Sequence, residues 1–330
     1  KVVSDVSRHL IDEGQIAFIS KQPNEMLNTL VSAHILVRTE DTAGLSFQHH
    51  QFQEWFTSHD VERLILQAAT DRRALERLQI DVLDNRSWTE AILFAVERIA
   101  RGDQIRRTAC ANAILKAFEV DPLLAADMIC RTTDEVWSIL SEKIQSLVRR
   151  WHAPGKLDRA FRFMMKTGRP EFIEILWPLF THENDQVHLS ALRAVERFRP
   201  SVFGKNAAQR LAGLALPVRK NVLCELAFNS DIEGMDLATS VAKADPDPEL
   251  KVSVANALSF RWADRHLADL LHDADDTVYD LLVAQRHVDD IDDIDDAIVQ
   301  EHLSAALARQ KAIGISPRER LWALSRTEPS

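Results

Sequence analysis

The sequence is poor in the residues that specialised folds depend on. Among its 330 residues are only 9 Gly, 3 Cys and a single Tyr. So little Gly excludes a collagen-like or glycine-rich chain, and so few Cys exclude a fold held together by many disulfides. No apolar run approaches the roughly 18 residues that span a bilayer, and no signal peptide is recognisable. We therefore expect no membrane association and a cytoplasmic location, with Cys110, Cys130 and Cys224 as buried, reduced thiols.

Motifs of the common enzyme classes are missing too. Gly204 and Lys205 lack both the upstream glycine and the following hydroxyl residue of a GxxxxGK[ST] phosphate loop. The chain also has no GxGxxG, GxSxG or HExxH motif. We therefore expect no catalytic residues here, and no P-loop of the chain's own for a nucleoside triphosphate.

What the sequence does contain is typical of a helical protein. Hydrophobic residues make up 46% and charged residues 27%, as in globular proteins. Leu, Ala, Arg, Asp and Glu dominate, which favours helix over sheet. The net charge of -10 disfavours nucleic-acid binding over the whole surface but leaves local basic patches possible. The chain begins at Lys1 without Met, which suggests a fragment of a longer protein.

Only the beginning of the chain predicts mixed secondary structure. Residues 23–33 have the spacing of a short helix, and residues 35–38 and 45–49 that of two strands around a polar turn. A helix, a hairpin and a further helix are the plan of a winged-helix unit. We assign residues 1–68 to the C-terminal part of such a domain.

From Gln51 onward the pattern is helical, with a possible break around residues 58–60. Ser87 to Glu90 has the sequence of a capping box, which predicts a helix over residues 91–100. The following helices are expected at residues 103–118, 122–131, 134–150, 157–166 and 171–180. Residues 69–180 are therefore predicted to form a helical bundle of degenerate helical repeats.

The second half carries a weak repeat. Four segments share a polar or Pro-containing start, a Val and then small and apolar residues at helical spacing; their Val residues are Val187, Val218, Val252 and Val278. Each interval accommodates one helical hairpin. Because such hairpins bury their apolar faces only by stacking, we expect a HEAT-like α-solenoid with C-terminal helices over residues 181–330. The fold class is mostly α.

Histidine and aspartate clusters are weak candidates for metal sites. His49 and His50 are adjacent, so in a strand they face opposite sides and do not easily bind one ion. His182 and His188 have no cysteine nearby, and the aspartates of 289–296 lack the glycine and glutamate of a calcium loop. We expect no metal site, and a solvated helix start at the aspartates.

A basic stretch interleaved with aromatics is a candidate ligand patch. Its cations are Arg149, Arg150, Lys156, Arg159, Arg162, Lys166 and Arg169. Together with Trp151, Phe161 and Phe163 they could hold phosphates, nucleic acid or an acidic peptide. Alternatively, the aromatics are core and the cations extend over the surface to acidic neighbours, which the acidic composition favours.

The stretch FQHHQFQEWF, from Phe47 to Phe56, resembles the closing motif of the winged-helix domain in NACHT-type signal-transduction (STAND) ATPases. The family pattern is Phe, any residue, His, three more residues, Gln-Glu and two aromatic or apolar residues. Phe47, His49, Gln53, Glu54, Trp55 and Phe56 match it without a gap. The resemblance covers roughly residues 20 to 65.

This resemblance implies a role for His49 as a latch that contacts the terminal phosphate of ADP bound to an upstream nucleotide-binding domain. ATP or ADP and Mg would then be cofactors of the longer protein. A histidine at a strand end can donate such a bond. The alternative is that His49 only packs between hairpin and helix. His50 is a bystander, Gln53 and Glu54 hold the helix start, and Trp55 and Phe56 are core.

Two functions follow as hypotheses. The resemblance implies the sensor and regulatory region of a NACHT-like ATPase, with bacterial antiphage defence as the expected setting and a protein ligand or a second copy as partner. The alternative is a free-standing α-solenoid scaffold that binds a protein or peptide. Nucleic acid is a less favoured partner of either.

Overall fold

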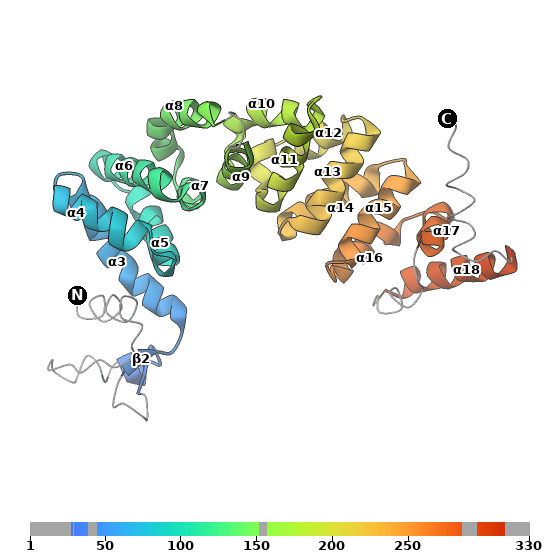
Figure 1. Cartoon of the computed structure of the whole chain (residues 1–330). Coiled ribbons are helices and arrows are strands. Elements are labelled where there is room, and N and C mark those ends of the chain that lie inside the picture. The colour runs from blue at the N-terminus through green and yellow to red at the C-terminus, as the bar shows by residue number, and fades with distance from the viewer. Residues whose placement is uncertain (1–27, 29, 39–44, 152–156, 286–295, 314–330) are drawn as a thin grey trace. The chain divides into compact units, whose positions relative to one another are not determined.

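The computed structural model describes residues 28, 30–38, 45–151, 157–285 and 296–313 (Figure 1). The chain divides into two compact units, residues 1–152 and residues 153–330, which we describe separately. Both consist mainly of paired helices, and the strands in the described ranges form one short antiparallel hairpin. The fold is therefore a mostly-α helical-repeat fold with a short β-hairpin, as the sequence predicts.

The first unit contains the hairpin and the helices up to residue 150. Its elements are β1 (Leu36–Arg38), β2 (Leu45–Phe47), α3 (His50–Ala68), α4 (Arg72–Arg77), the π-helix η1 (Leu78–Leu83), the short η2 (Arg86–Trp88), α5 (Thr89–Ala100), α6 (Gln104–Val120), α7 (Pro122–Arg131) and α8 (Asp134–Arg150). The bounds of α7 and α8 are those that the sequence predicts.

The second unit is entirely helical in its described residues. Its elements are α9 (Leu157–Thr167), η3 (Pro170–Phe172), α10 (Ile173–Leu176), η4 (Trp177–Thr181), α11 (Asp185–Ala194), η5 (Val195–Arg197), η6 (Pro200–Phe203), α12 (Ala207–Ala212), α13 (Leu216–Asn229), α14 (Ile232–Ala244), α15 (Pro248–Ser259), α16 (Asp264–His272), α17 (Asp276–Gln285) and α18 (Ala297–Ile313). Instead of the predicted helix over 171–180, short helical turns follow one another.

The hairpin has a small core of its own. Leu36 pairs with Phe47 and Arg38 with Leu45 across the two strands. Leu36, Leu45 and Phe47 are buried, and apolar residues from before and after the strands, including Phe56 of α3, pack on them. This arrangement ties the hairpin to the start of α3. Most of the predicted helix over 23–33 and the turn over 39–44 lie outside the described residues.

Helix α3 is one continuous helix of 19 residues. The break predicted around residues 58–60 is wrong, because Ser58 and Asp60 lie buried within the helix. The capping box predicted at Ser87 to Glu90 is also wrong: Asn85 caps this start instead, and its side chain accepts a hydrogen bond from the Ser87 N–H at 3.0 Å.

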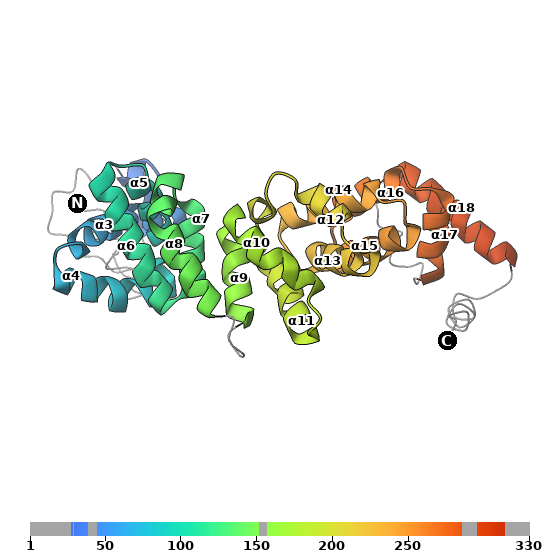
Figure 2. The same cartoon turned by 90° about the horizontal axis from the view of Figure 1, so that it is seen from above.

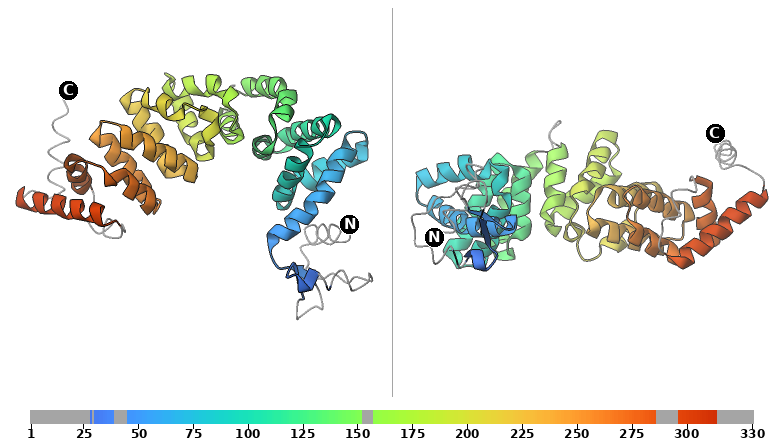
Figure 3. Two further views of the ribbon diagram at one scale, coloured as in Figure 1. Left: turned by 180° about the vertical axis from the view of Figure 1, so that it is seen from behind. Right: turned by 90° about the horizontal axis from the view of Figure 1, so that it is seen from below.

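The predicted repeat is present in the second unit. Its four copies form α11, α13, α15 and α17, and the last three are each the first helix of a pair. Helix α13 packs on α14 and α15, α14 on α16, and α15 on α17. Figures 2 and 3 show these helices side by side from further directions. Each pair therefore buries its apolar face against the next, as a stacked array requires.

The predicted three-part division, with boundaries at 68/69 and 180/181, remains a prediction. The compact units meet at a different place, between residues 152 and 153. None of the helices in the described ranges combines the length and the apolar character that crossing a bilayer requires.

Candidate functional site

His49 lies at the point where the hairpin passes into α3. It is the N-cap residue of this helix, with φ of -126° and ψ of 135°. Its side chain is exposed and does not bond to the helix start; its ring lies 5.8 Å from that of Phe52. This exposure speaks against the alternative in which His49 only packs between hairpin and helix, and its role as a latch stays a prediction. An imidazole in this position can reach a ligand from outside.

The residues after His49 differ from one another in exposure. His50 is exposed and its Nδ1 lies 3.1 Å from the carboxylate of Glu54. Burial raises the pKa of Glu54, while His50 acts in the opposite direction. Phe56 stacks on Phe47 of the hairpin at 6.0 Å and joins its core. Trp55 is 44% exposed, so its prediction as a core residue is wrong.

A polar network joins α3 to the two helices that follow. Glu62 of α3 is 14% exposed and accepts hydrogen bonds from Arg98 of α5 and Arg106 of α6, both at 2.8 Å. Arg98 also donates to the Ser58 hydroxyl at 2.8 Å. Hydrogen bonds from the two arginines hold the pKa of Glu62 below its usual range, against the opposing effect of burial. The network joins α3 to α5 and α6.

The predicted basic patch is not assembled within one unit. Arg149 and Arg150 are exposed at the end of α8 in the first unit, whereas Arg159, Arg162, Lys166 and Arg169 belong to the second. Arg162 lies 3.8 Å from Glu196. Lys156 lies outside the described residues. As a ligand patch these seven cations remain a prediction.

The aromatics of that stretch are structural. Phe161 and Phe163 are fully buried. Trp151 stacks on Phe118 with ring centroids 4.6 Å apart and planes 8° apart. The interpretation in which the aromatics are core is therefore confirmed for Phe161 and Phe163, whereas Trp151 is half-buried.

The described residues contain no group of three or more His, Cys, Asp or Glu side chains that could hold a metal ion. His182 is exposed, and its Nδ1 accepts a hydrogen bond from the N–H of Asn184 at 3.0 Å. Of the aspartates over 289–296, only Asp296 is described: its carboxylate accepts from the N–H of Val299 at 3.1 Å and so begins α18.

The cysteines are free thiols in unreactive surroundings. Cys110 is buried, whereas Cys130 and Cys224 are half-buried, so the prediction of full burial holds for the first alone. Burial raises the pKa of Cys110 to about 12 and that of Cys224 to about 11. Because the thiolate is the nucleophile, neither has the character of a catalytic cysteine.

An open cleft of about 270 Å³, which the sequence does not predict, lies among the described helices of the first unit. Helices α3, α4, η1 and α6 line it with small and apolar side chains, including Ile65, Leu78 and Ala113, and α8 borders it with Lys143. Asn112, Lys116, Glu119 and Lys143 are its polar lining residues. Its volume lies just below the roughly 300–1,000 Å³ typical of ligand pockets. It offers no constellation of catalytic groups.

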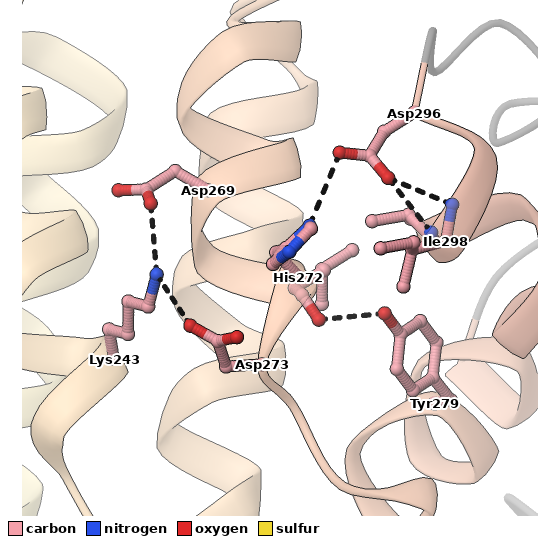
Figure 4. A network of polar contacts seen from close by, with 9 residues as sticks. Lys243, Asp269, His272, Asp273, Tyr279, Asp296 and Ile298 are labelled. Carbon is pink, nitrogen blue, oxygen red and sulfur yellow. Dashed lines mark hydrogen bonds and ion pairs between the residues drawn. The ribbon is translucent and has the colours of Figure 1, made fainter.

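Figure 4 shows a polar network in the second unit. Lys243 of α14 lies 2.9 Å from Asp269 of α16 and 3.0 Å from Asp273 at the end of that helix. His272 lies 3.5 Å from Asp296, the cap of α18. Hydrogen bonds to the two aspartates raise the pKa of Lys243. These contacts connect α14 to α16 and α16 to α18.

Tyr279, the single Tyr, is the buried member of this network. It is fully buried, and its hydroxyl donates to the carbonyl oxygen of Leu271 at 2.7 Å (Figure 4). Burial and the nearby aspartates raise its pKa to about 12. The hydroxyl therefore stays protonated at neutral pH and does not serve as a base.

Replacing Tyr279 with Phe is expected to lower the free energy of unfolding by about 1–2 kcal/mol, because the carbonyl of Leu271 loses its buried donor. The raised pKa of Tyr279 also makes the free energy of unfolding depend on pH. The native state resists ionisation of this tyrosine, so wild-type stability falls as the pH rises from about 10, the ordinary value, to about 12. Urea unfolding across this range should show a smaller decline in Tyr279→Phe; an equal decline would contradict the assignment.

Two neighbouring turns of the second unit expose large apolar side chains. We call Phe228, Ile232, Phe260 and Trp262 the turn patch; they lie at the α13–α14 and α15–α16 turns. The rings of Phe228 and Phe260 meet edge to face with centroids 6.4 Å apart. Helical spacing of apolar residues does not distinguish them from core residues. Their exposure depends on the packing of the array and was missed.

Comparisons with protein-family models, curated proteins and solved structures found no match to this chain.

Proposed function

We propose that this chain is the sensor and regulatory region of a NACHT-like signal-transduction ATPase, and that it acts without catalytic residues of its own. The observation that carries the proposal is the exposed His49 at the N-terminus of α3, directly after the hairpin. The surrounding residues follow the family motif as far as Phe56. Antiphage defence is the setting that the resemblance implies.

The arrangement around His49 suits a latch. An exposed imidazole at the end of a hairpin can donate a hydrogen bond to a phosphate oxygen of ADP, and more strongly when it is protonated. The Glu62 network connects α3 to α5 and α6, so a ligand bound to these helices of the first unit can act on the hairpin. Exchange of ADP for ATP, with Mg, in the nucleotide-binding domain would release the latch.

The gene offers a direct test. The coding sequence upstream of Lys1 should encode Walker A and Walker B motifs in the nucleotide-binding domain that the proposal requires. A start codon directly before Lys1, with no such domain encoded upstream, would refute the proposal.

Replacing His49 with Ala in the full-length protein is expected to speed ADP release by about tenfold or more, because a charge-assisted bond contributes about 1.5–3 kcal/mol. Basal signalling should rise with it. The measurement is the dissociation rate of a fluorescent ADP analogue. His50→Ala is the matched control, since His50 is also exposed and pairs with Glu54. Equal release rates in His49→Ala and wild type would refute the latch.

A second candidate is an α-solenoid scaffold that binds a protein or peptide. The turn patch favours it, because contiguous exposed apolar side chains are typical of protein-binding surfaces. This function and the latch use different parts of the chain.

A further inference from the structure

The turn patch is much more exposed than the rest of the large apolar side chains around it. Phe228 is 44% exposed, Ile232 65%, Phe260 72% and Trp262 82%. Phe228 and Ile232 flank the α13–α14 turn, and Phe260 and Trp262 lie in the α15–α16 turn. Large aromatics of this kind supply most of the binding energy at protein interfaces.

The two turns are fixed to each other. Arg261 lies between Phe260 and Trp262, and its Nη1 donates to the carbonyl oxygens of Phe228 at 2.6 Å and Ser230 at 3.2 Å. One arginine therefore closes the α13–α14 turn against the α15–α16 turn. The backbone that carries Phe260 and Trp262 is therefore fixed before any partner binds, which limits the entropy lost on binding.

Trp262 has an unusual backbone for its residue type. Its φ is 54°, in the left-handed region. Its N–H donates to Ser259 at 3.1 Å and the N–H of Ala263 to Leu258 at 3.2 Å, which together form the Schellman end of α15. Glycine is the favoured residue in this position because any other side chain is strained there. An exposed tryptophan at this position therefore does not stabilise the fold. Its presence points to a role in binding.

The charges around the patch select its partner. Residues 228–266, which include both turns, contain 7 Asp and Glu and 4 Lys and Arg. Asp231, Glu233 and Asp264 are exposed next to patch residues in the sequence. Such surroundings repel polyanions such as nucleic acids and anionic membranes. They attract cations, which also bind the face of an indole.

We propose that the turn patch binds a cationic amphipathic segment of a partner protein. Its apolar side chains would cover Phe228, Phe260 and Trp262, and its Lys or Arg residues would face Asp231, Glu233 and Asp264. This inference rests on the second candidate function and names its partner class. It is independent of the latch at His49.

The test uses a fluorescent helical Leu/Lys peptide as the probe, with anisotropy as the readout. Phe260→Ser and Trp262→Gly should each weaken its binding by about tenfold. Ile105→Ser is the matched control, because Ile105 is 78% exposed in the first unit and should change affinity by less than about twofold. Asp264→Asn should weaken binding by a smaller factor and reduce its salt dependence.

Trp262→Gly also separates binding from folding. Glycine relieves the left-handed residue, so the thermal midpoint of this variant should equal or exceed that of the wild type while its affinity falls. A purely structural role for Trp262 predicts the reverse, with a lower midpoint and unchanged affinity.

Several results would overturn the proposal. These are no binding of the Leu/Lys peptide, equal affinity for a Leu/Glu peptide, or unchanged affinity in Trp262→Gly. Binding of oligothymidine or of phosphatidylserine vesicles that is lost in Trp262→Gly would assign the patch to nucleic acid or membrane instead. Because Trp262→Gly should leave ADP release unchanged and His49→Ala should leave peptide binding unchanged, failure of one proposal is distinguishable from failure of the other.

Discussion

Replacing Glu62 with Ala is expected to lower the free energy of unfolding of the first unit by about 2 kcal/mol, because it leaves two arginines without their shared partner. Arg98 is 29% exposed and Arg106 43%, so water replaces part of the lost interaction and the cost stays below that of a fully buried ion pair. The variant also loosens the attachment of α3 to α5 and α6. It should therefore weaken the connection between the hairpin and helices α5 and α6.

Chemical denaturation measures the effect, and Glu76→Ala is its control. Glu76 pairs with Arg72 at 3.1 Å on the surface, where the two side chains are 55% and 91% exposed. Loss of such an exposed pair costs about 0.5 kcal/mol or less. If the two variants lose the same stability, the Glu62 network does not hold α3 in place.

Because the pKa of Glu62 is lowered, the contribution of the same network to stability depends on pH. A carboxyl group with a lowered native pKa stabilises the fold fully above its unfolded value, about 4.3, and this contribution is lost as the pH falls through the native pKa. The difference in stability between wild type and Glu62→Ala should therefore be largest near neutral pH and shrink below about pH 4.

Replacing Phe203 with Ala is expected to destabilise the second unit by about 4 kcal/mol, the cost of a large cavity in a packed core. Phe203 is fully buried, and its ring lies 4.9 Å from that of Phe198, 5.6 Å from Trp177 and 5.9 Å from Phe180. It fills the centre of an aromatic cluster between the short helical turns that precede α12.

Guanidinium unfolding followed by tryptophan fluorescence is the measurement for Phe203→Ala. Phe260→Ala is the control, because Phe260 is 72% exposed and its loss should cost about 0.5 kcal/mol or less. A loss below about 1.5 kcal/mol in Phe203→Ala would mean that the surrounding rings collapse into the space.

Helices with clear end signals could be predicted from the sequence. Asp121 and Pro122 begin α7, and the acidic pair after Thr133 begins α8, so both helices have the predicted bounds. The break predicted in α3 failed for a tertiary reason. Ser58 accepts a bond from Arg98, a partner 40 residues away, and this contact is not visible in local propensities.

In the candidate sites, too, local features could be predicted from the sequence and features that depend on tertiary packing could not. The position of His49 at the start of a helix follows from the motif, whereas its exposure depends on how the hairpin packs. The turn patch escaped prediction because an apolar residue at the end of a helix can be core or surface. Glu62 was missed for a similar reason: its partners come from two other helices.

The stacking of α13 to α17 has a consequence for how this part of the chain can change. Because each helix contacts mainly the next two along the chain, the stability of the array is close to a sum of neighbouring interfaces. Folding can start at any pair and spread, and outer pairs can open while inner ones stay closed. Gain or loss of a whole pair disturbs a single interface. Evolution can therefore lengthen or shorten the array without redesigning its core.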